Sequence, residues 1–179
     1  TKKAVLDVHV IAKQAYIEKQ SNVITSYLFL FEDCAEVNPK SMFSMLICFN
    51  LWLEDEDQGV VQKTMALLSK SIRIESRIGE KVAEKVVNLL KHYEPTERHV
   101  TYIRFAIESL MGFNNVYDTV MWSIQKHITT SKRNVLRSMI SALMDATALG
   151  LLNTEDMQEL INKTETDKKT KIKLLISIQ

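Results

Sequence analysis

The sequence predicts an all-α protein, an α-solenoid of about five antiparallel helix pairs. Only four Gly and two Pro occur in 179 residues, and strand-rich chains usually need more turn residues than that. Apolar residues recur every three or four positions, which is the period of amphipathic helices. The apolar pattern itself repeats every 35 to 40 residues, as expected for stacked helix pairs.

The periodicity predicts ten helices joined by short loops. Pro95 is expected in a first helical turn, where a missing N–H costs little, and Gly112 is expected to cap a helix end. Short polar side chains that accept backbone N–H bonds are expected to begin the helices at Ser21 or Asn22, residues 129–131, Asn153 or Thr154, and Thr166 or Asp167. The expected helices are residues 4–19, 23–37, 41–53, 60–73, 75–93, 95–112, 115–128, 132–149, 155–162 and 168–178.

The second helix of each pair begins with a valine, and these valines lie 37, 40 and 35 residues apart. A large apolar residue follows each valine by five positions, and further apolar residues follow by seven and eight, with Glu108 as the exception. Two helices per period of this length are typical of HEAT and armadillo arrays, in which each pair buries its apolar face against its neighbours. The valines are Val23, Val60, Val100 and Val135, and the residues five positions later are Leu28, Met65, Phe105 and Ile140.

The segment LWLEDEDQGVVQKTMALL resembles the HEAT-repeat pattern, in which an acidic turn is followed by valine and small apolar residues. Asp55, Asp57, Val60 and Val61 match that pattern, whereas the usual arginine after the valine is absent: Gln62 or Val61 occupies its position, with Lys63 nearby. The resemblance implies that residues 1–179 form a single HEAT-like helical-repeat domain, a fragment of a longer chain.

Residues 27 to about 111 also resemble the N-terminal HEAT domain of the symplekin family, the scaffolds of mRNA 3′-end processing. The matching segments are YLFLFEDCAEVNPKSMFSML, LWLEDEDQGVVQKTMAL and HVTYIRFAIESLM, and no match continues after Gly112. The resemblance implies a nuclear, intracellular scaffold on which a phosphatase that acts on the RNA polymerase II tail, or an RNA-processing factor, docks on one face of the array.

Basic residues recur on the second helices, which line the concave surface of a HEAT array. A basic inner surface suits an acidic peptide, a phosphorylated tail or RNA; the alternative interpretation is ordinary solvated charge. The lysines of residues 168–173 are interpreted as the polar face of the last helix. The candidate partner-binding residues are Lys63, Lys70, Arg73, Arg98, Arg104, Lys132, Arg133 and Arg137.

The sequence offers no recognisable catalytic, metal or cofactor site. The four histidines have no nucleophile or carboxylate partner at a recognisable spacing, and His92 and His99, which flank Pro95, lack further zinc ligands. The acidic turn at residues 54–57 lacks the ligand spacing of a calcium loop and is interpreted as structural. Trp52, Trp122, Cys34 and Cys48 are expected in the core, with the cysteines reduced.

These observations predict a non-enzymatic protein-interaction scaffold without cofactor, metal or small-molecule substrate. RNA binding, as in the helical-repeat domains of translation or RNA-processing factors, is the alternative. A formal net charge of +1 disfavours a strongly electrostatic nucleic-acid binder but leaves room for a local basic patch. The longest apolar run, residues 45–53, is interrupted by Asn50 and is too short to span a bilayer, so no membrane partner is expected.

Overall fold

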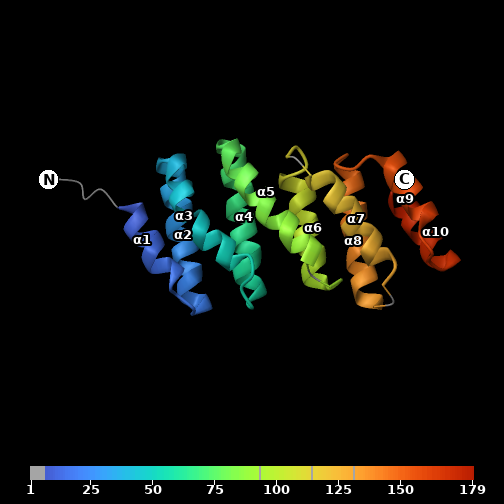
Figure 1. Ribbon diagram of the computed structural model, residues 1–179, viewed down its shortest axis with the longest axis horizontal. Helices are drawn as coiled ribbons and strands as arrows, with labels where there is room; N and C mark the ends of the chain where they lie inside the picture. The colour runs from blue at the N-terminus through green and yellow to red at the C-terminus, as the bar shows by residue number, and fades with distance from the viewer. Residues whose placement is uncertain (1–6, 93, 114, 131) are drawn as a thin grey trace. The chain divides into compact units, whose positions relative to one another are not determined.

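The computed structural model describes residues 7–92, 94–113, 115–130 and 132–179. Within these ranges it contains ten α-helices, one short 3₁₀ helix and no strand, which confirms the predicted all-α class (Figure 1). The helices are α1 (Val8–Tyr16), α2 (Ser21–Val37), α3 (Met42–Trp52), α4 (Gln58–Ile74), α5 (Ser76–His92), α6 (Glu97–Ser109), α7 (Val116–Ile128), α8 (Arg133–Ala148), α9 (Thr154–Lys163) and α10 (Lys168–Ser177), and the 3₁₀ helix is η1 (Pro39–Ser41).

The chain divides into two compact units, Thr1–Val82 and Ala83–Gln179, with the boundary inside α5. In the first unit α1 packs against α3 and α2 against α4, while neighbours along the chain also contact each other. In the second unit α6 packs against α8, α8 against α10, and α7 against α9. Each unit therefore has two layers of helices, in which alternate helices along the chain lie in the same layer.

An aromatic cluster forms the centre of the first unit. The Phe31 ring from α2 stacks on Trp52 at a centroid distance of 5.8 Å and meets the edge of Phe49 at 6.0 Å. All three side chains are fully buried. Such pairs add to the free energy gained by burying apolar area, so α2 and α3 are held together chiefly by these rings.

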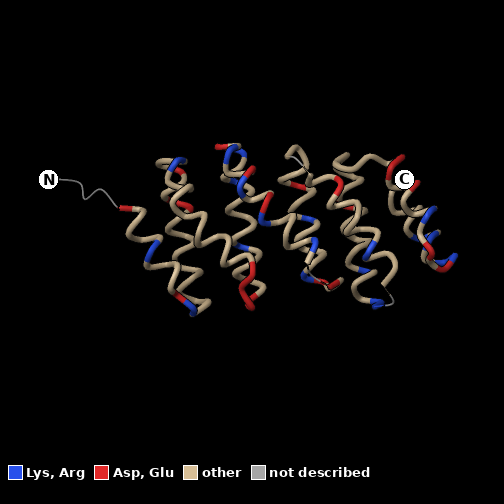
Figure 2. The backbone as a smooth tube through the Cα atoms, viewed as in Figure 1, with Lys and Arg blue, Asp and Glu red and all other residues tan. Residues whose placement is uncertain are grey.

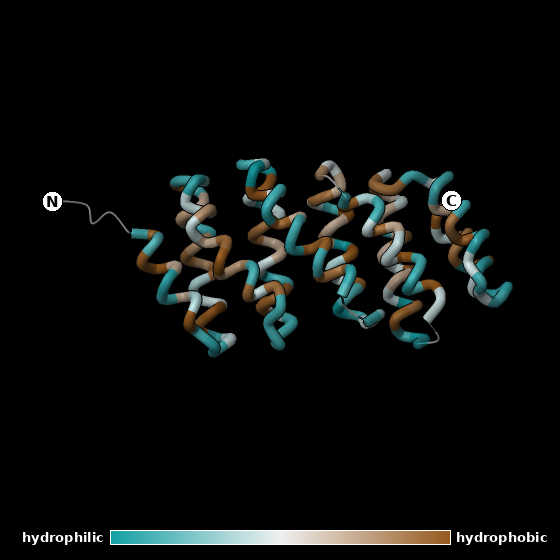
Figure 3. Tube along the Cα trace, viewed as in Figure 1, coloured by the Kyte–Doolittle hydropathy of each residue, from teal (hydrophilic) through white to brown (hydrophobic). Residues whose placement is uncertain are grey.

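Helix α3 is almost entirely apolar but is not fully buried. Phe43, Ile47 and Leu51 lie four residues apart and are exposed, at 36%, 54% and 45% of their maximal area. Helix α3 contacts α1, α2 and α4, and Phe43, Ile47 and Leu51 share the face that these helices leave exposed. Figure 3 shows the alternation of hydrophobic and hydrophilic stretches along the helices around it.

Most residues at the repeated apolar positions are buried in the core of their unit. Val60, Val100 and Val135 are buried and Val23 is half-buried, while Glu108 is exposed as its charge requires. The residues that follow by five positions behave alike: Leu28, Met65 and Phe105 are buried and Ile140 is half-buried.

The helix caps agree with the sequence at α9 and α10. Asn153 accepts hydrogen bonds from the first backbone N–H groups of α9, and Asp167 accepts one from Thr170 N. The prediction was wrong at α2, where Gln20 is the cap residue and Ser21 already belongs to the helix. At α8 the cap residue is Lys132, which makes no side-chain cap bond, and the proposed Ser131 lies outside the described residues.

The boundaries of α6 also differ from the prediction. Thr96 caps its start by accepting from His99 N, so the helix begins at Glu97 and Pro95 lies before it rather than in its first turn. Leu110, not Gly112, is the residue at its end. A short hydroxyl side chain after the proline offers the cap, and this local hydrogen bond decides the start. The predicted helix ends at residues 4–6 and 93 lie outside the described residues.

The two tryptophans have different environments. Trp52 is fully buried, as predicted, but Trp122 is 44% exposed on α7, where the Lys126 ammonium lies 5.1 Å from its ring centroid. The core of α7 is instead formed by Val120 and Ile124, because these positions face the neighbouring helices. Cys48 is buried as expected, whereas Cys34 is only half-buried.

The acidic turn before α4 acts as a helix start. Asp57 Oδ1 accepts from Gly59 N at 2.7 Å, and Asp55 Oδ1 accepts from Asp57 N at 2.8 Å. Replacing Asp57 by Ala should lower the free energy of unfolding by about 1 kcal/mol, because a first-turn N–H loses its acceptor. The exposed neighbour Glu56, changed to Ala, is the control. Denaturant titration measures both, and equal losses in the two variants would contradict a capping role.

Candidate anion-binding site

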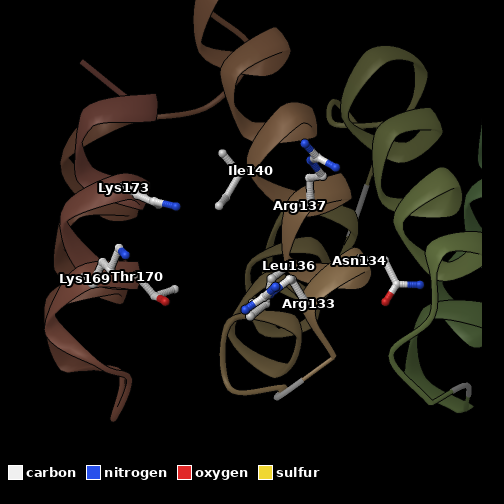
Figure 4. A pocket seen from close by; sticks show the side chains of 8 residues that line it. All are labelled: Arg133, Asn134, Leu136, Arg137, Ile140, Lys169, Thr170 and Lys173. Atoms are coloured by element: carbon white, nitrogen blue, oxygen red, sulfur yellow. The ribbon is translucent and has the colours of Figure 1, made fainter.

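A groove of about 910 Å³ lies between α8 and α10 in the second unit (Figure 4). Its walls combine four basic side chains with two uncharged polar and two apolar ones. No acidic residue is among those that line it in the part of the chain that the structure describes. The lining residues are Arg133, Asn134, Leu136, Arg137, Ile140, Lys169, Thr170 and Lys173.

Helical spacing places the four cations in two pairs, one on each helix. Arg133 and Arg137 are four residues apart on α8, and Lys169 and Lys173 are four residues apart on α10. Residues at this spacing share a helix face and are separated by about 6 Å along the axis. In Figure 4 the lysines come from α10 and the arginines from α8, with Lys173 pointing from α10 toward α8 and Arg137 on the side of α8 away from α10. The groove therefore presents positive charge from both sides.

The remaining basic residues of α10 do not line the groove. Lys171 donates to the backbone carbonyl of Asn162 at 2.8 Å, which directs its charge toward α9. Helix α10 carries four lysines and no acidic residue, so its charge is concentrated even though only two of its lysines line the groove. Figure 2 shows the basic stretches along α8 and α10.

The start of α8 adds to the positive potential. Its cap residue Lys132 makes no side-chain cap bond, and its first turn holds no acidic residue. The free N–H groups of a helix start and the helix dipole both favour a nearby anion. At α10 the corresponding place is taken by Asp167, whose pKa is lowered chiefly by the hydrogen bond from Thr170 and also by the nearby Lys169.

The groove cations have no ion-pair partner among the described residues. All four are exposed and none forms a salt bridge in those ranges, while the Asp167 carboxylate interacts electrostatically with Lys169. Four like charges along one groove repel one another, and an anion in the groove would relieve that repulsion. The arrangement can therefore bind an anionic group without breaking an existing ion pair.

A smaller groove of about 470 Å³ between α6 and α8 shares Arg137 with the first one. Here Arg104 is already paired. Arg104 Nη2 lies 3.1 Å from Asp145 Oδ2 and donates to Ser141 Oγ at 3.0 Å. Arg137 lines both grooves and forms no salt bridge among the described residues, so this second groove is only partly neutralised.

The other predicted residues of the second unit lie apart from the α8–α10 groove. The Arg98 guanidinium donates to the Tyr102 hydroxyl at 3.0 Å, and Arg104 is paired in the smaller groove. Lys132 is exposed at the start of α8. Of the predicted residues, the structure brings Arg133 and Arg137 together in this groove.

The three predicted residues of the first unit have local partners or are solvated. The Lys63 ammonium lies 5.5 Å from the centroid of the Phe29 ring. Lys70 lies between two carboxylates of α2, 2.7 Å from Glu36 and 2.9 Å from Glu32, and these raise its pKa. Arg73 is exposed on α4.

Sequence reasoning missed the two groove lysines, Lys169 and Lys173, which were interpreted only as the polar face of the last helix. A signal was present: both basic pairs have the spacing of one helix face, and neither stretch, 132–144 or 168–179, contains an acidic residue. That α8 and α10 are neighbours is a tertiary fact, which no local pattern contains.

Among the described residues, no three His, Cys, Asp or Glu side chains are grouped as a metal would require. No helix in the described ranges combines the length and apolarity needed to cross a membrane. Comparison of the chain with protein-family models, with curated proteins and with solved structures gives no match.

Proposed function

We propose that the chain is a non-enzymatic scaffold of HEAT-like helix pairs that binds an acidic or phosphorylated segment of a partner protein in the α8–α10 groove. The observation that carries the proposal is the set of four cations that line one groove and form no salt bridge among the described residues. Arginine and lysine pairs are the groups that recognise carboxylates and phosphates in proteins.

The solenoid architecture is supported by the sequence separation of residues in contact. In stacked repeats each side chain meets the equivalent helix of the next repeat, one period further along the chain. Hydrogen bonds join Cys48 to Ala12, 36 residues apart, and Arg104 to Ser141, 37 apart. Thr166 and Ile128 are 38 apart. These separations fall within the period of 35 to 40 read from the valines.

A polypeptide is the better candidate ligand than RNA. The groove lining includes Leu136 and Ile140, both half-buried, which offer apolar contact beside the charges. Among the described residues that line it, none has an aromatic side chain on which a base could stack, and single-stranded nucleic acid sites commonly rely on such stacking. The low net charge also favours a local anionic contact over a polyelectrolyte.

The cellular setting of the proposal rests on the sequence resemblance to the symplekin family. On that resemblance we propose that the scaffold acts in the nucleus, in mRNA 3′-end processing or transcription, with a phosphatase or an RNA-processing factor as its partner. Direct RNA binding by the same groove is the second function, favoured by the phosphate affinity of clustered arginines.

Fluorescence anisotropy with labelled probes tests the proposal on the full chain. The probes are a short acidic peptide with two phosphoserines, the same peptide without phosphate, and a single-stranded RNA of similar length. We expect the phosphopeptide to bind tightest and to weaken at least about tenfold between about 50 mM and about 200 mM salt. Tighter binding of the RNA would contradict peptide binding and favour RNA binding. Absence of binding of every probe at low salt would contradict both functions.

A further inference from the structure

Two histidines of the second unit form a buried pair that the proposed function does not use. His99 on α6 and His127 on α7 are 1% and 0% exposed, and their rings stack with centroids 4.7 Å apart. His99 Nδ1 lies 3.1 Å from His127 Nε2. Imidazole is the side chain whose charge changes near neutral pH, so a buried pair is a potential response to acid.

The outer nitrogens of the pair both meet backbone carbonyls. His99 Nε2 lies 3.0 Å from Leu90 O, and His127 Nδ1 lies 2.7 Å from Ser123 O. A carbonyl oxygen only accepts, so both contacts are hydrogen bonds in the tautomer that carries its hydrogen on each of these nitrogens. A neutral imidazole has one N–H, which leaves His99 Nδ1 and His127 Nε2 as two bare lone pairs facing each other. In this neutral pair the two contacts with carbonyls are hydrogen bonds, and the contact between the two rings is not.

Protonation acts on this arrangement in two steps. The first proton fits between the facing nitrogens and completes the third hydrogen bond, at the cost of a charge buried away from water. A second proton would place two cations 3.1 Å apart, and the rings could no longer keep their contact. The packed arrangement therefore accommodates at most one proton, whereas two separated histidines in water accept two.

The surroundings favour the neutral pair. Burial is the largest influence on both rings and lowers the pKa of each, that of His99 to about 4, to which the neighbouring His127 also contributes. Lys126, from α7 itself, repels a proton on either ring. The groups that face the rings from the neighbouring segments are the backbone carbonyls of Leu90, in α5, and Thr96, just before α6. Among the described residues no carboxylate is hydrogen-bonded to either ring.

The pair joins three helix ends. Leu90 lies in the last turn of α5, where carbonyls have no partner within the helix, so the His99 N–H satisfies one of them. His99 also lies in the first turn of α6, and His127 in the last turn of α7. Opening the pair would free the end of α5 and the start of α6 together.

We propose that His99 and His127 form an acid-responsive latch that is closed and neutral near pH 7, keeps its contact with one shared proton, and opens the α5–α6 junction when it takes up the second. Both groups titrate lower in the folded chain than the ordinary value of about 6.5. The stability that they contribute is therefore complete above about pH 6.5 and is lost as the pH falls toward about 4.

Hydrogen exchange followed by mass spectrometry tests the latch in the whole chain. After correction for the intrinsic rate, we expect the amides of residues 86–103 to exchange at least about tenfold faster at about pH 5 than at about pH 7. His99→Gln with His127→Asn keeps a side-chain N–H for each carbonyl and cannot titrate, so the difference should disappear. His92→Gln, at an exposed histidine, should retain it.

Imidazole nitrogen NMR of the unmodified chain supplies a second measurement if the double variant does not fold. At about pH 7 we expect the Nε2–H form of His99 and the Nδ1–H form of His127, with both titrating below the range of free histidine. Titration of either ring near its ordinary value, a charged pair at neutral pH, or an unchanged exchange rate at acid pH would overturn the proposal.

Discussion

Replacing Phe31 by Ala is expected to lower the free energy of unfolding of the first unit by about 3–5 kcal/mol. The side chain is fully buried, and its ring contacts Trp52 at 5.8 Å and Phe49 at 6.0 Å between centroids. The substitution removes apolar contact, leaves a cavity between α2 and α3, and breaks three aromatic pairs, the third with Tyr27 at 6.2 Å. Because domains are commonly stable by only about 5–15 kcal/mol, this single change should bring the unit close to unfolding.

A matched control lies two residues away on the same helix. Phe29 is 60% exposed, and its recorded ring contact is with the Lys63 ammonium, so Phe29→Ala should cost under about 1 kcal/mol. Denaturant titration followed by Trp52 fluorescence, in a Trp122→Phe background, reports on the first unit alone. Similar losses for the two alanine variants would contradict the assignment of Phe31 to the core.

The helices were predictable from sequence because their cause is local. An apolar residue at every third or fourth position specifies which face a helix buries. Val60, Val100 and Val135, which were named from this pattern, are all buried. The errors came where two local signals compete. Trp122 is as apolar as its neighbours Val120 and Ile124, and only the packing of α7 decides which of them faces the core.

The contacts between helices were not predictable from one sequence. Arg133 and Arg137 could be named as binding residues, but the groove also needs Lys169 and Lys173, which reach it because α10 packs against α8. The histidine pair is a similar case. His99 and His127 are 28 residues apart, which is less than one repeat, so even the repeat period gives no reason to join them.

Apolar packing in the core stabilises the position of α8, whereas the like charges in the groove oppose its close approach to α10. Helix α8 buries Val135, Met139 and Leu143 and so is fixed in place by apolar packing. On its other face Arg133 and Arg137 line the groove together with the lysines of α10, where like charges oppose close approach. A rigid apolar face thus holds in register a charged face that contributes nothing favourable until an anion is bound, which is the property of a preorganised binding site.

Charge reversal on α8 is expected to abolish most of the binding. Arg133→Glu combined with Arg137→Glu removes two charge-assisted contacts, each worth about 1.5–3 kcal/mol, and places two carboxylates against an anionic ligand. The phosphopeptide affinity should fall at least about 100-fold, since every 1.4 kcal/mol is about a factor of ten. Folding should persist because both side chains are exposed and a glutamate in the first turn of a helix is favourable.

The control has the same change in net charge away from the groove lining. Lys81→Glu with Lys91→Glu alters two exposed lysines of α5. This control should weaken binding by no more than about threefold through the general electrostatic field, which salt screens. Equal losses in the two double variants would mean that net charge, rather than the α8–α10 groove, attracts the ligand. A large loss confined to the α8 variant, with an unchanged melting temperature, would locate the anionic group beside Arg133 and Arg137.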